Sequence, residues 1–227
     1  MSNNLVRFNS FLPSKVRDNK IFFILSVEFN YNNLEKIADH IKDFNEPIKY
    51  FIFSRSVSNS IKDKTDLETD IIISGLFRIK EDYGITVVSN FGSGERDITK
   101  RLKTVDIILI DSFNALNTDI IKGLTISKKP LIIDTLLLDK EDIYKIGEIA
   151  ENDNAPLSFL FDDITIKYID IYEKFFSFLK LDIFSDKIIN SSLDLGIKGF
   201  FINVNSVEDV KYLSDVILNK VLKKFKI

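Results

Sequence analysis

Two stretches of the sequence decide the fold class that it predicts: Val105-Asp-Ile-Ile-Leu-Ile-Asp111 and Lys129-Pro-Leu-Ile-Ile-Asp134-Thr135-Leu136. Each contains a short run of large aliphatic residues that ends in an aspartate. Such runs are typical of strands that are buried on both faces, as in a parallel sheet covered by helices. Four other runs have the same character, namely Ile21–Val27, Ile48–Phe53, Asp70–Ser74 and Ile85–Ser89. The pattern therefore predicts an α/β protein with a parallel β-sheet flanked by helices.

Segments of helical period connect and follow these runs. Residues Asn33–Phe44 place their apolar side chains on one stripe, and Asn32 or Asn33 is a suitable N-cap. A strand, this helix and the next strand form the crossover that parallel strands require. After Asp139 the pattern predicts a helical C-terminal part. Its expected helices are Asp142–Ala150, Ile166–Leu181 and a last one that a capping box at Ser206–Asp209 opens.

Composition limits the classes of function. Apolar residues make up 45% of the 227 residues and 20 are Phe, which is enough for a substantial core. The net charge of −3 argues against a protein built mainly to bind nucleic-acid phosphates. The absence of Cys excludes disulfides, a thiolate nucleophile and cysteine-based metal sites. No apolar run approaches the roughly 18 residues that span a bilayer, and no signal peptide is evident, so we expect a cytoplasmic protein.

Two nucleotide-binding folds are alternatives to consider. Residues Ile107–Asp111 resemble a Walker B strand, but the chain has no Gly-x-x-x-x-Gly-Lys-Ser/Thr loop to hold a triphosphate. The order and spacing of segments from Asp106 to Pro156 are similar to those of a dinucleotide-binding fold of the glucose–fructose oxidoreductase type. That fold needs glycines after its first strand, and positions 26–31 contain none. A degenerate Rossmann-type dinucleotide-binding protein stays as the alternative.

Several positions, in order, resemble the DHH phosphoesterase family of RecJ-like nucleases. Ser26 stands for the histidine of that family's first motif, and Asn30 and Asn32 stand for its two aspartates. The degenerate site positions that the resemblance implies are Ser26, Asn30, Asn32, Asp111, Asp134, Thr135, Leu136 and Phe200. Only two carboxylates remain among them, and two carboxylates cannot bind two metal ions. The resemblance therefore implies a protein without catalytic residues, metal or cofactor.

The inactive branch of that family supplies the functional expectation. The chain resembles the RecJ-like subunit of the archaeal CMG replicative helicase. In that complex the subunit accompanies MCM and GINS. The resemblance implies a non-catalytic structural subunit of an archaeal DNA replication helicase complex, associated with the nucleoid. This subunit would bind GINS, support MCM and bind DNA weakly or not at all by itself. We expect one degenerate DHH-like domain over residues 1–227, with its core at about 20–205, a C-terminal helix at about 206–225 and no second nucleic-acid-binding domain.

A partner surface is expected on the helix predicted at Ile166–Leu181. Aromatic side chains lie on more than one side of that helix, which is more than one buried face needs. The residues of this possible partner surface are Tyr168, Tyr172, Phe175 and Phe178.

Overall fold

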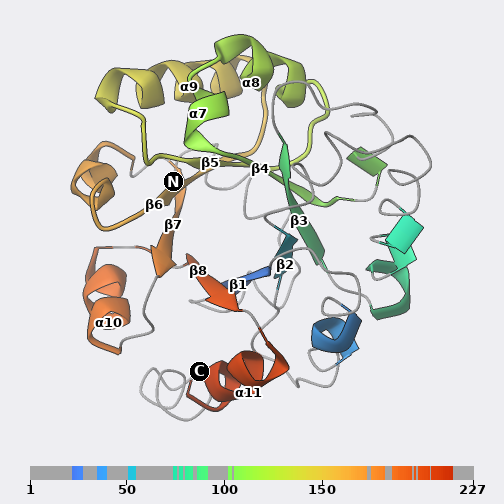
Figure 1. The fold of residues 1–227 in the computed structure, drawn as a ribbon. Helices are drawn as coiled ribbons and strands as arrows, with labels where there is room; N and C mark the ends of the chain where they lie inside the picture. The colour runs from blue at the N-terminus through green and yellow to red at the C-terminus, as the bar shows by residue number, and fades with distance from the viewer. Residues whose placement is uncertain are drawn as a thin grey trace.

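The computed structural model describes residues 22–27, 35–39, 51–54, 74–75, 77–78, 80–83, 86–91, 102–103, 105–172, 175–181, 186–195, 197, 199–204 and 206–216. Within these residues, parallel strands close into a barrel in the order in which they follow along the chain. The strands are β1 (Phe22–Val27), β2 (Phe51–Ser54), β3 (Thr86–Phe91), β4 (Ile107–Ile110), β5 (Leu131–Asp134), β6 (Leu157–Phe161), β7 (Phe176–Leu181) and β8 (Gly199–Val204). Figure 1 looks along the barrel, with the strands around the centre and the helices outside them.

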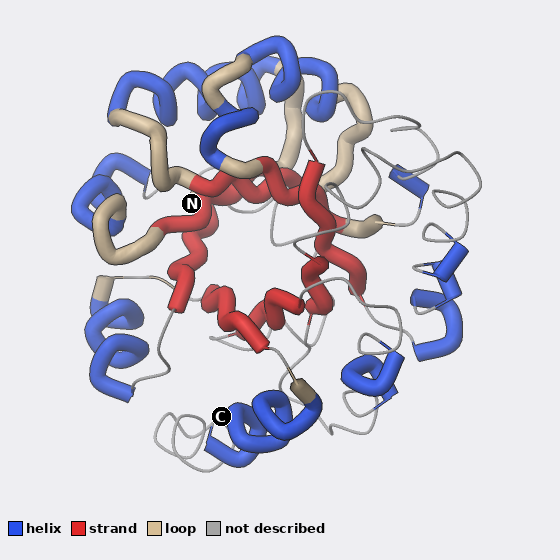
Figure 2. Tube along the Cα trace, in the orientation of Figure 1, coloured by secondary structure: helices blue, strands red, loops and turns tan. Residues whose placement is uncertain are grey.

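Helices cover the outside of the barrel wherever the structure describes the connections. The helices whose bounds are described are α7 (Ser112–Ala115), α8 (Thr118–Thr125), α9 (Lys140–Asn152), the 3₁₀ helix η1 (Ile166–Tyr172), α10 (Asp186–Asp194) and α11 (Val207–Val216). Residues 35–39, 74–75, 77–78, 80–83 and 102–103 are helical as well. Figure 2 shows the ring of strands inside the ring of helices. Pairing of β1 with β8, from Phe22 opposite Gly199 to Val27 opposite Val204, closes the ring. This is the (β/α)₈ architecture, in which a helical crossover follows each parallel strand.

Two apolar clusters follow from the alternation of side chains along the strands. The barrel interior contains Ile24, Val88, Ile107, Leu109, Ile132, Leu160, Phe176, Phe178 and Phe201. The other cluster fills the layer between strands and helices and includes Ile108, Ile110, Leu131, Ile133, Phe159, Phe161, Phe200 and Ile202. Adjacent strand residues fall in opposite clusters, as a period of two requires. Strands buried on both faces therefore account for the near-continuous apolar runs of the sequence.

The prediction of a parallel sheet flanked by helices is confirmed, but the expected DHH-like form of it is wrong. Of the expected strands, those near residues 21–27, 48–53, 85–89, 105–110 and 130–133 correspond to β1 to β5. The strand expected at Asp70–Ser74 is not confirmed, because Ser74 lies in a helix and residues 70–73 fall outside the described residues. The division of the chain into domains stays a prediction.

The expected helical C-terminal part contains three strands. The helix expected at Ile166–Leu181 is wrong: η1 ends at Tyr172, and β7 begins at Phe176. The segment Phe-Ser-Phe-Leu-Lys-Leu of β7 fits either period when read alone, and pairing with β6 and β8 selects the extended form. The sequence reading also missed β6, whose five residues are all buried.

Local signals at the helix ends were read correctly. The helix expected at Asp142–Ala150 is α9, which a capping box of Asp139 and Asp142 begins. Ser206 Oγ accepts a hydrogen bond of 3.1 Å from the Asp209 backbone N–H, and the Asp209 carboxylate accepts one of 3.1 Å from the Ser206 N–H. This is the capping box expected for α11. The end of that helix expected near residue 225 falls outside the described residues.

Gly199 provides a test of the packing inside the barrel. A Cβ atom at this position would lie 2.4 Å from Cδ1 and 2.6 Å from Cε1 of the buried Phe178 ring. We expect Gly199→Ala to lower the free energy of unfolding by about 1–3 kcal/mol, the usual cost of overpacking, as measured by denaturant titration.

Two further variants make this test specific. Gly123→Ala in α8 is the matched control, because a Cβ there meets nothing within 4 Å. It should stabilise the protein by roughly 0.5–1 kcal/mol through helix propensity. Combining Gly199→Ala with Phe178→Leu should cost less than the sum of the two single changes, because the smaller side chain leaves room for the methyl group. If the two changes in the free energy of unfolding simply add, the close contact between position 199 and the Phe178 ring is contradicted.

Candidate functional site

Charged side chains gather where four consecutive strands end. In a parallel barrel all strands point the same way, so their carboxyl ends form one mouth, and (β/α)₈ enzymes carry their active sites there. The charged residues are Asp111 just after β4, Asp134 at the end of β5, Asp162 just after β6 and Lys180 near the end of β7. The residues two positions earlier on the same strands belong to the interior cluster, and they are Leu109, Ile132, Leu160 and Phe178. The alternation therefore directs the charged group of each strand toward the barrel axis.

The strand register places these residues in neighbouring pairs. Ile110 is registered with Ile133, so Asp111 and Asp134, one residue further on, are neighbours across β4 and β5. In the same way, the registered pair of Phe161 and Leu179 places Asp162 beside Lys180. Neighbouring strands lie about 4.8 Å apart. The mouth thus presents three carboxylates and one ammonium group on a floor of Phe and aliphatic side chains. We call Asp111, Asp134, Asp162 and Lys180 the mouth cluster.

Two of the carboxylates organise the loops that follow their strands. Asp111 caps α7: its Oδ1 accepts hydrogen bonds from the Asn114 backbone N–H at 2.8 Å and from Nδ2 at 2.9 Å. The Nδ2 of Asn114 also donates to Asp111 Oδ2 at 2.7 Å. Asp162 Oδ1 accepts from the backbone N–H groups of Ile164 and Thr165 at 3.0 and 2.8 Å and from Thr165 Oγ1 at 2.8 Å. These hydrogen bonds hold both carboxylates in fixed positions at the mouth.

Asp134 differs from these two in having one protein donor among the described residues. The Leu136 backbone N–H donates to its Oδ1 at 3.0 Å. Burial raises the pKa of Asp134; the Leu136 hydrogen bond and the charge of Lys180 oppose this rise, and the charges of Asp162 and Asp111 add to it. Desolvation disfavours the charged carboxylate, which is the physical reason for the direction. A half-buried carboxyl group with a raised pKa is a stronger base than an ordinary aspartate, which suits it to proton transfer.

Lys180 supplies the positive charge of the mouth. Its side chain is half-buried, and no carboxylate among the described residues lies within ion-pair distance of its Nζ. Its charge still acts on Asp134, as the pKa of that residue shows. Asn203, which follows the interior residue Phe201 by two positions on β8, is exposed at the same end of the barrel. Within the described residues, no three His, Cys, Asp or Glu side chains converge closely enough to bind one metal ion.

The site positions expected from the sequence are distributed over different parts of the fold. Asp111 and Asp134 meet at the mouth, whereas Ser26 is a residue of β1 and Asn30 and Asn32 lie outside the described residues. The remaining positions, Thr135, Leu136 and Phe200, lie near or on the strands. Thr135 is buried with its Oγ1 2.8 Å from Thr165 Oγ1, and Leu136 is exposed. Phe200 is buried between β8 and the helices, away from the barrel axis.

The aromatic residues of the expected partner surface do not share one face. Tyr168, in η1, packs partly buried against the outer cluster, and Tyr172 ends η1. Phe175 packs edge-on against Phe159, with ring centroids 5.2 Å apart. Phe178 is fully buried inside the barrel, 5.5 Å from the ring of Phe201. The helix that was to display them together is absent, because this segment contains β7.

The sequence reading missed Asp162 and Lys180. Asp162 is not among the site positions expected from the sequence, and it is hydrogen-bonded to its own loop. The available signal was the alternation Phe-x-Phe-x-Lys in residues 176–180, which places a lysine in line with two large apolar side chains. This alternation was assigned to a helix, so the direction of Lys180 was not recognised.

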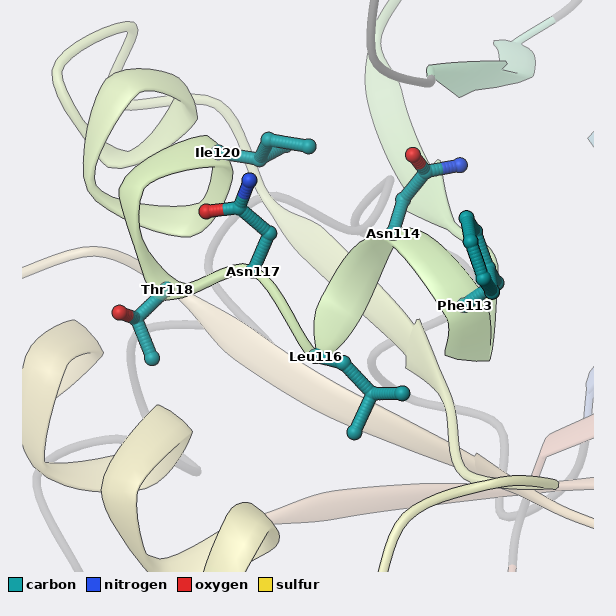
Figure 3. Close-up of a pocket in the computed structure, with 6 residues that line it drawn as sticks. All are labelled: Phe113, Asn114, Leu116, Asn117, Thr118 and Ile120. Carbon is teal, nitrogen blue, oxygen red and sulfur yellow. The ribbon is translucent and has the colours of Figure 1, made fainter.

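A separate hollow lies beside the mouth, on the connection from β4 to α8. Its volume is about 460 Å³, and its lining residues are Phe113, Asn114, Leu116, Asn117, Thr118 and Ile120. Figure 3 shows these side chains on α7, on the turn that follows it and on the first turn of α8. Phe113 is 71% exposed and Leu116 is 47% exposed, so the hollow is an open surface feature. It carries no charged group, and the mouth cluster is the stronger candidate for chemistry.

Comparison with known proteins identifies the class of fold. No protein-family model and no curated protein sequence matches this chain. Among solved structures, phospho-2-dehydro-3-deoxyheptonate aldolase (DAHP synthase) from Thermotoga maritima is similar with a TM-score of 0.70 and 15% identity. The match covers 92% of this chain and 71% of that one. The N-acetylneuraminic acid synthetase of Leptospira borgpetersenii gives a TM-score of 0.62 at 13% identity, covering 82% and 74%.

A spore coat polysaccharide biosynthesis protein E, described as putative, from Chromobacterium violaceum is similar as well. Its TM-score is 0.64 at 15% identity, and the match covers 82% of this chain and 66% of that one. At these identities the likeness shows the fold alone. The chain therefore has the aldolase-type barrel fold that these biosynthetic proteins share.

These findings correct the expectations drawn from the DHH resemblance. The recognition of a RecJ-like family member is wrong, because the structural neighbours are barrel synthases. The helicase-subunit function and the expectation of an inactivated enzyme are wrong for the same reason. The Rossmann-type alternative is not supported either, since the sheet is a closed barrel and not an open one. GINS and MCM as partners were inferred from that resemblance alone, and they stay an untested prediction. No described helix is both long and apolar enough to cross a membrane.

The raised pKa of Asp134 predicts the pH dependence of stability. A carboxyl group whose pKa is raised by folding adds stability below its unfolded pKa, and this stability is lost as the pH rises through the folded value. The charged form of Asp134 therefore lowers the free energy of unfolding relative to the neutral form. We expect Asp134→Asn to raise the melting temperature at pH 7, with the gain shrinking as the pH falls toward about 4, near the ordinary pKa of Asp.

Asp139, at the exposed start of α9, is a control whose pKa shifts in the direction opposite to that of Asp134. Its pKa is lowered by hydrogen bonds from the backbone of Asp142 and Glu141, the effect of Asp142 being the larger, so its charge stabilises the fold above the unfolded pKa. Asp139→Asn should lower the melting temperature at pH 7, and this loss should shrink as the pH falls. Melting curves with the same pH dependence for both variants would contradict the assignment.

Proposed function

We propose that this protein is an enzyme that moves protons on a small, negatively charged, carbonyl-containing substrate of the carbohydrate type at the mouth of its barrel. The mouth cluster carries this proposal. Three carboxylates and a lysine that has no ion-pair partner among the described residues lie together at the carboxyl ends of β4 to β7, above the apolar interior cluster. Charged groups gathered at the mouth of a barrel, one of them with a raised pKa, are expected where a ligand binds.

The floor of the site favours this chemistry because it excludes water. Phe176, Phe178 and Phe201 fill the barrel interior, with rings 5.1 and 5.5 Å apart in the two neighbouring pairs. A charged group above such a floor is partly desolvated, which strengthens its interaction with a bound substrate. The raised pKa of Asp134 is one consequence of that environment.

Asp134 is the proton-transferring group in this proposal. Its second carboxylate oxygen has no protein donor among the described residues, whereas both oxygens of Asp111 are engaged by Asn114. Asp134 would accept a proton from the carbon next to the substrate carbonyl, leaving an enolate whose negative charge lies on the carbonyl oxygen. The same carboxyl group would return a proton in the reverse step. A base with a raised pKa removes such a proton more effectively than an ordinary aspartate.

Lys180 binds and polarises the substrate in this arrangement. Its ammonium group offers three donors and a positive charge to a carboxylate, a phosphate or a developing enolate oxygen. The names of the structural neighbours support the substrate class, since two refer to sugar acids and one to polysaccharide biosynthesis. Sugar acids combine the negative charge and the carbonyl group that this site suits.

Exchange of substrate hydrogen with solvent tests the proposal without a known second substrate. The protein is incubated in D₂O with pyruvate, hydroxypyruvate or dihydroxyacetone phosphate, and proton NMR follows loss of the hydrogens next to the carbonyl. We expect exchange above the protein-free rate with at least one compound. Asp134→Asn should reduce that rate about 100-fold or more, in the usual range for general acid–base groups.

Matched variants separate the mouth from the rest of the surface. Lys187 is an exposed lysine on α10, so Lys187→Met should exchange as fast as the unchanged protein. Lys180→Met should slow exchange at low substrate concentration because binding weakens. Equal exchange by the unchanged protein and Asp134→Asn would overturn the assignment of the site, and exchange with none of the three compounds would count against the substrate class.

A further inference from the structure

We infer that Lys180 is a nucleophile that forms a Schiff base with the carbonyl carbon of the substrate; this inference rests on the proposed function and adds a covalent step to it. The amine of a lysine forms such intermediates with aldehydes and ketones, and they withdraw electrons from the neighbouring carbon more strongly than a carbonyl does. The geometry of β7 is the main support.

The position of Lys180 on β7 sets the direction in which its side chain leaves the strand. Phe176 and Phe178 precede it at intervals of two and belong to the interior cluster, and its registered partner on β8, Phe201, is an interior residue too. The lysine stem therefore continues the apolar inner face of the strand, and its amine reaches the level of the mouth. A substrate held between the strand ends would meet this amine.

Lys180 is also distinguished from the other half-buried lysines that the structure describes. Lys80 Nζ is paired with Asp106 at 2.6 Å, and Lys129 Nζ donates to the Val105 carbonyl at 2.8 Å. Those two amines bind the segment that leads into β4, at the opposite end of the strands, and serve the fold. Lys180 makes no such contact with the described residues, and this difference sets it apart from the two structural lysines.

The neighbouring carboxylates provide the proton transfers that the step requires. The mouth cluster carboxylate of Asp134 takes one proton from the ammonium group, and the neutral nitrogen attacks the carbonyl carbon. A C–N bond forms while the carbonyl π electrons move to oxygen, and a second nitrogen proton reaches that oxygen. Asp134 then returns its proton, and the oxygen leaves as water. Two ammonium protons depart in the water, and the third stays on the positively charged imine nitrogen.

Reductive trapping on the full-length protein tests this step. The protein is incubated with pyruvate, hydroxypyruvate or dihydroxyacetone phosphate, then treated with sodium borohydride, and intact and peptide mass spectra are recorded. We expect one adduct, with the mass of the carbonyl compound less one oxygen atom, on the peptide that contains Lys180. Lys187→Met should give the same adduct, whereas Lys180→Met and Lys180→Arg should give none.

The absence of cysteine permits a restoration experiment. Lys180→Cys introduces a single thiol, which 2-bromoethylamine converts to a lysine analogue with an amine at nearly the same place. Trapping should be absent before this treatment and return after it, which a purely structural role of Lys180 would not produce. Circular dichroism of each variant confirms that the barrel is folded.

The outcomes separate this inference from the proposed function. Solvent exchange at Asp134 without an adduct at Lys180 would overturn the Schiff base and leave the proposed function standing. An adduct spread over exposed lysines, with no preference for Lys180, would overturn the inference as well. Loss of both exchange and adduct would remove the two proposals together.

Discussion

Closure of the barrel is the constraint on which the rest of the structure depends. The ladder between β1 and β8 pairs six residues on each strand, from Phe22 with Gly199 to Val27 with Val204. Closure removes the two free edges of the sheet and turns one face of every strand toward a narrow axis. Side chains on that face must fill a fixed space, so bulky Phe rings require a glycine opposite them at Gly199. The same closure brings the strand ends together as one mouth.

The sequence reveals the parts of this fold whose signals are local. Runs of Ile, Leu and Phe identify β1 to β5, the helical period from Asp142 identifies α9, and the capping box at Ser206 identifies the start of α11. Each of these signals depends on residues close together in the chain. Hydrophobic periodicity and capping are properties of the segment itself, so they can be read without the partner strands.

Strand number and closure depend on distant pairing, and the sequence reading lacked this information. The β7 segment satisfies helical and extended spacing alike, and only its ladders with β6 and β8 decide between them. With β6 to β8 unrecognised, Asp111 and Asp134 were fitted to an open-sheet enzyme, and Lys180 had no assigned direction. Asp111 and Asp134 were therefore predicted as site positions, but in the wrong fold. The similarity to barrel synthases at 13–15% identity is not visible in any motif of this chain.

The aromatic floor beneath the mouth separates the residues that stabilise the barrel from the charged residues of the candidate site. Stability of the barrel comes from interior residues such as Phe178 and Phe201 and from the outer layer, whereas the charged residues lie at the carboxyl ends of the strands. Sites that do not touch contribute to stability nearly independently, so a change in the charged layer alters the apolar packing below it only little. The same interior packing can therefore support different sets of charged side chains, and so different chemistries, at the mouth. A chain can therefore keep this barrel while its mouth carries different side chains, which is consistent with 13–15% identity to the synthases whose fold it shares.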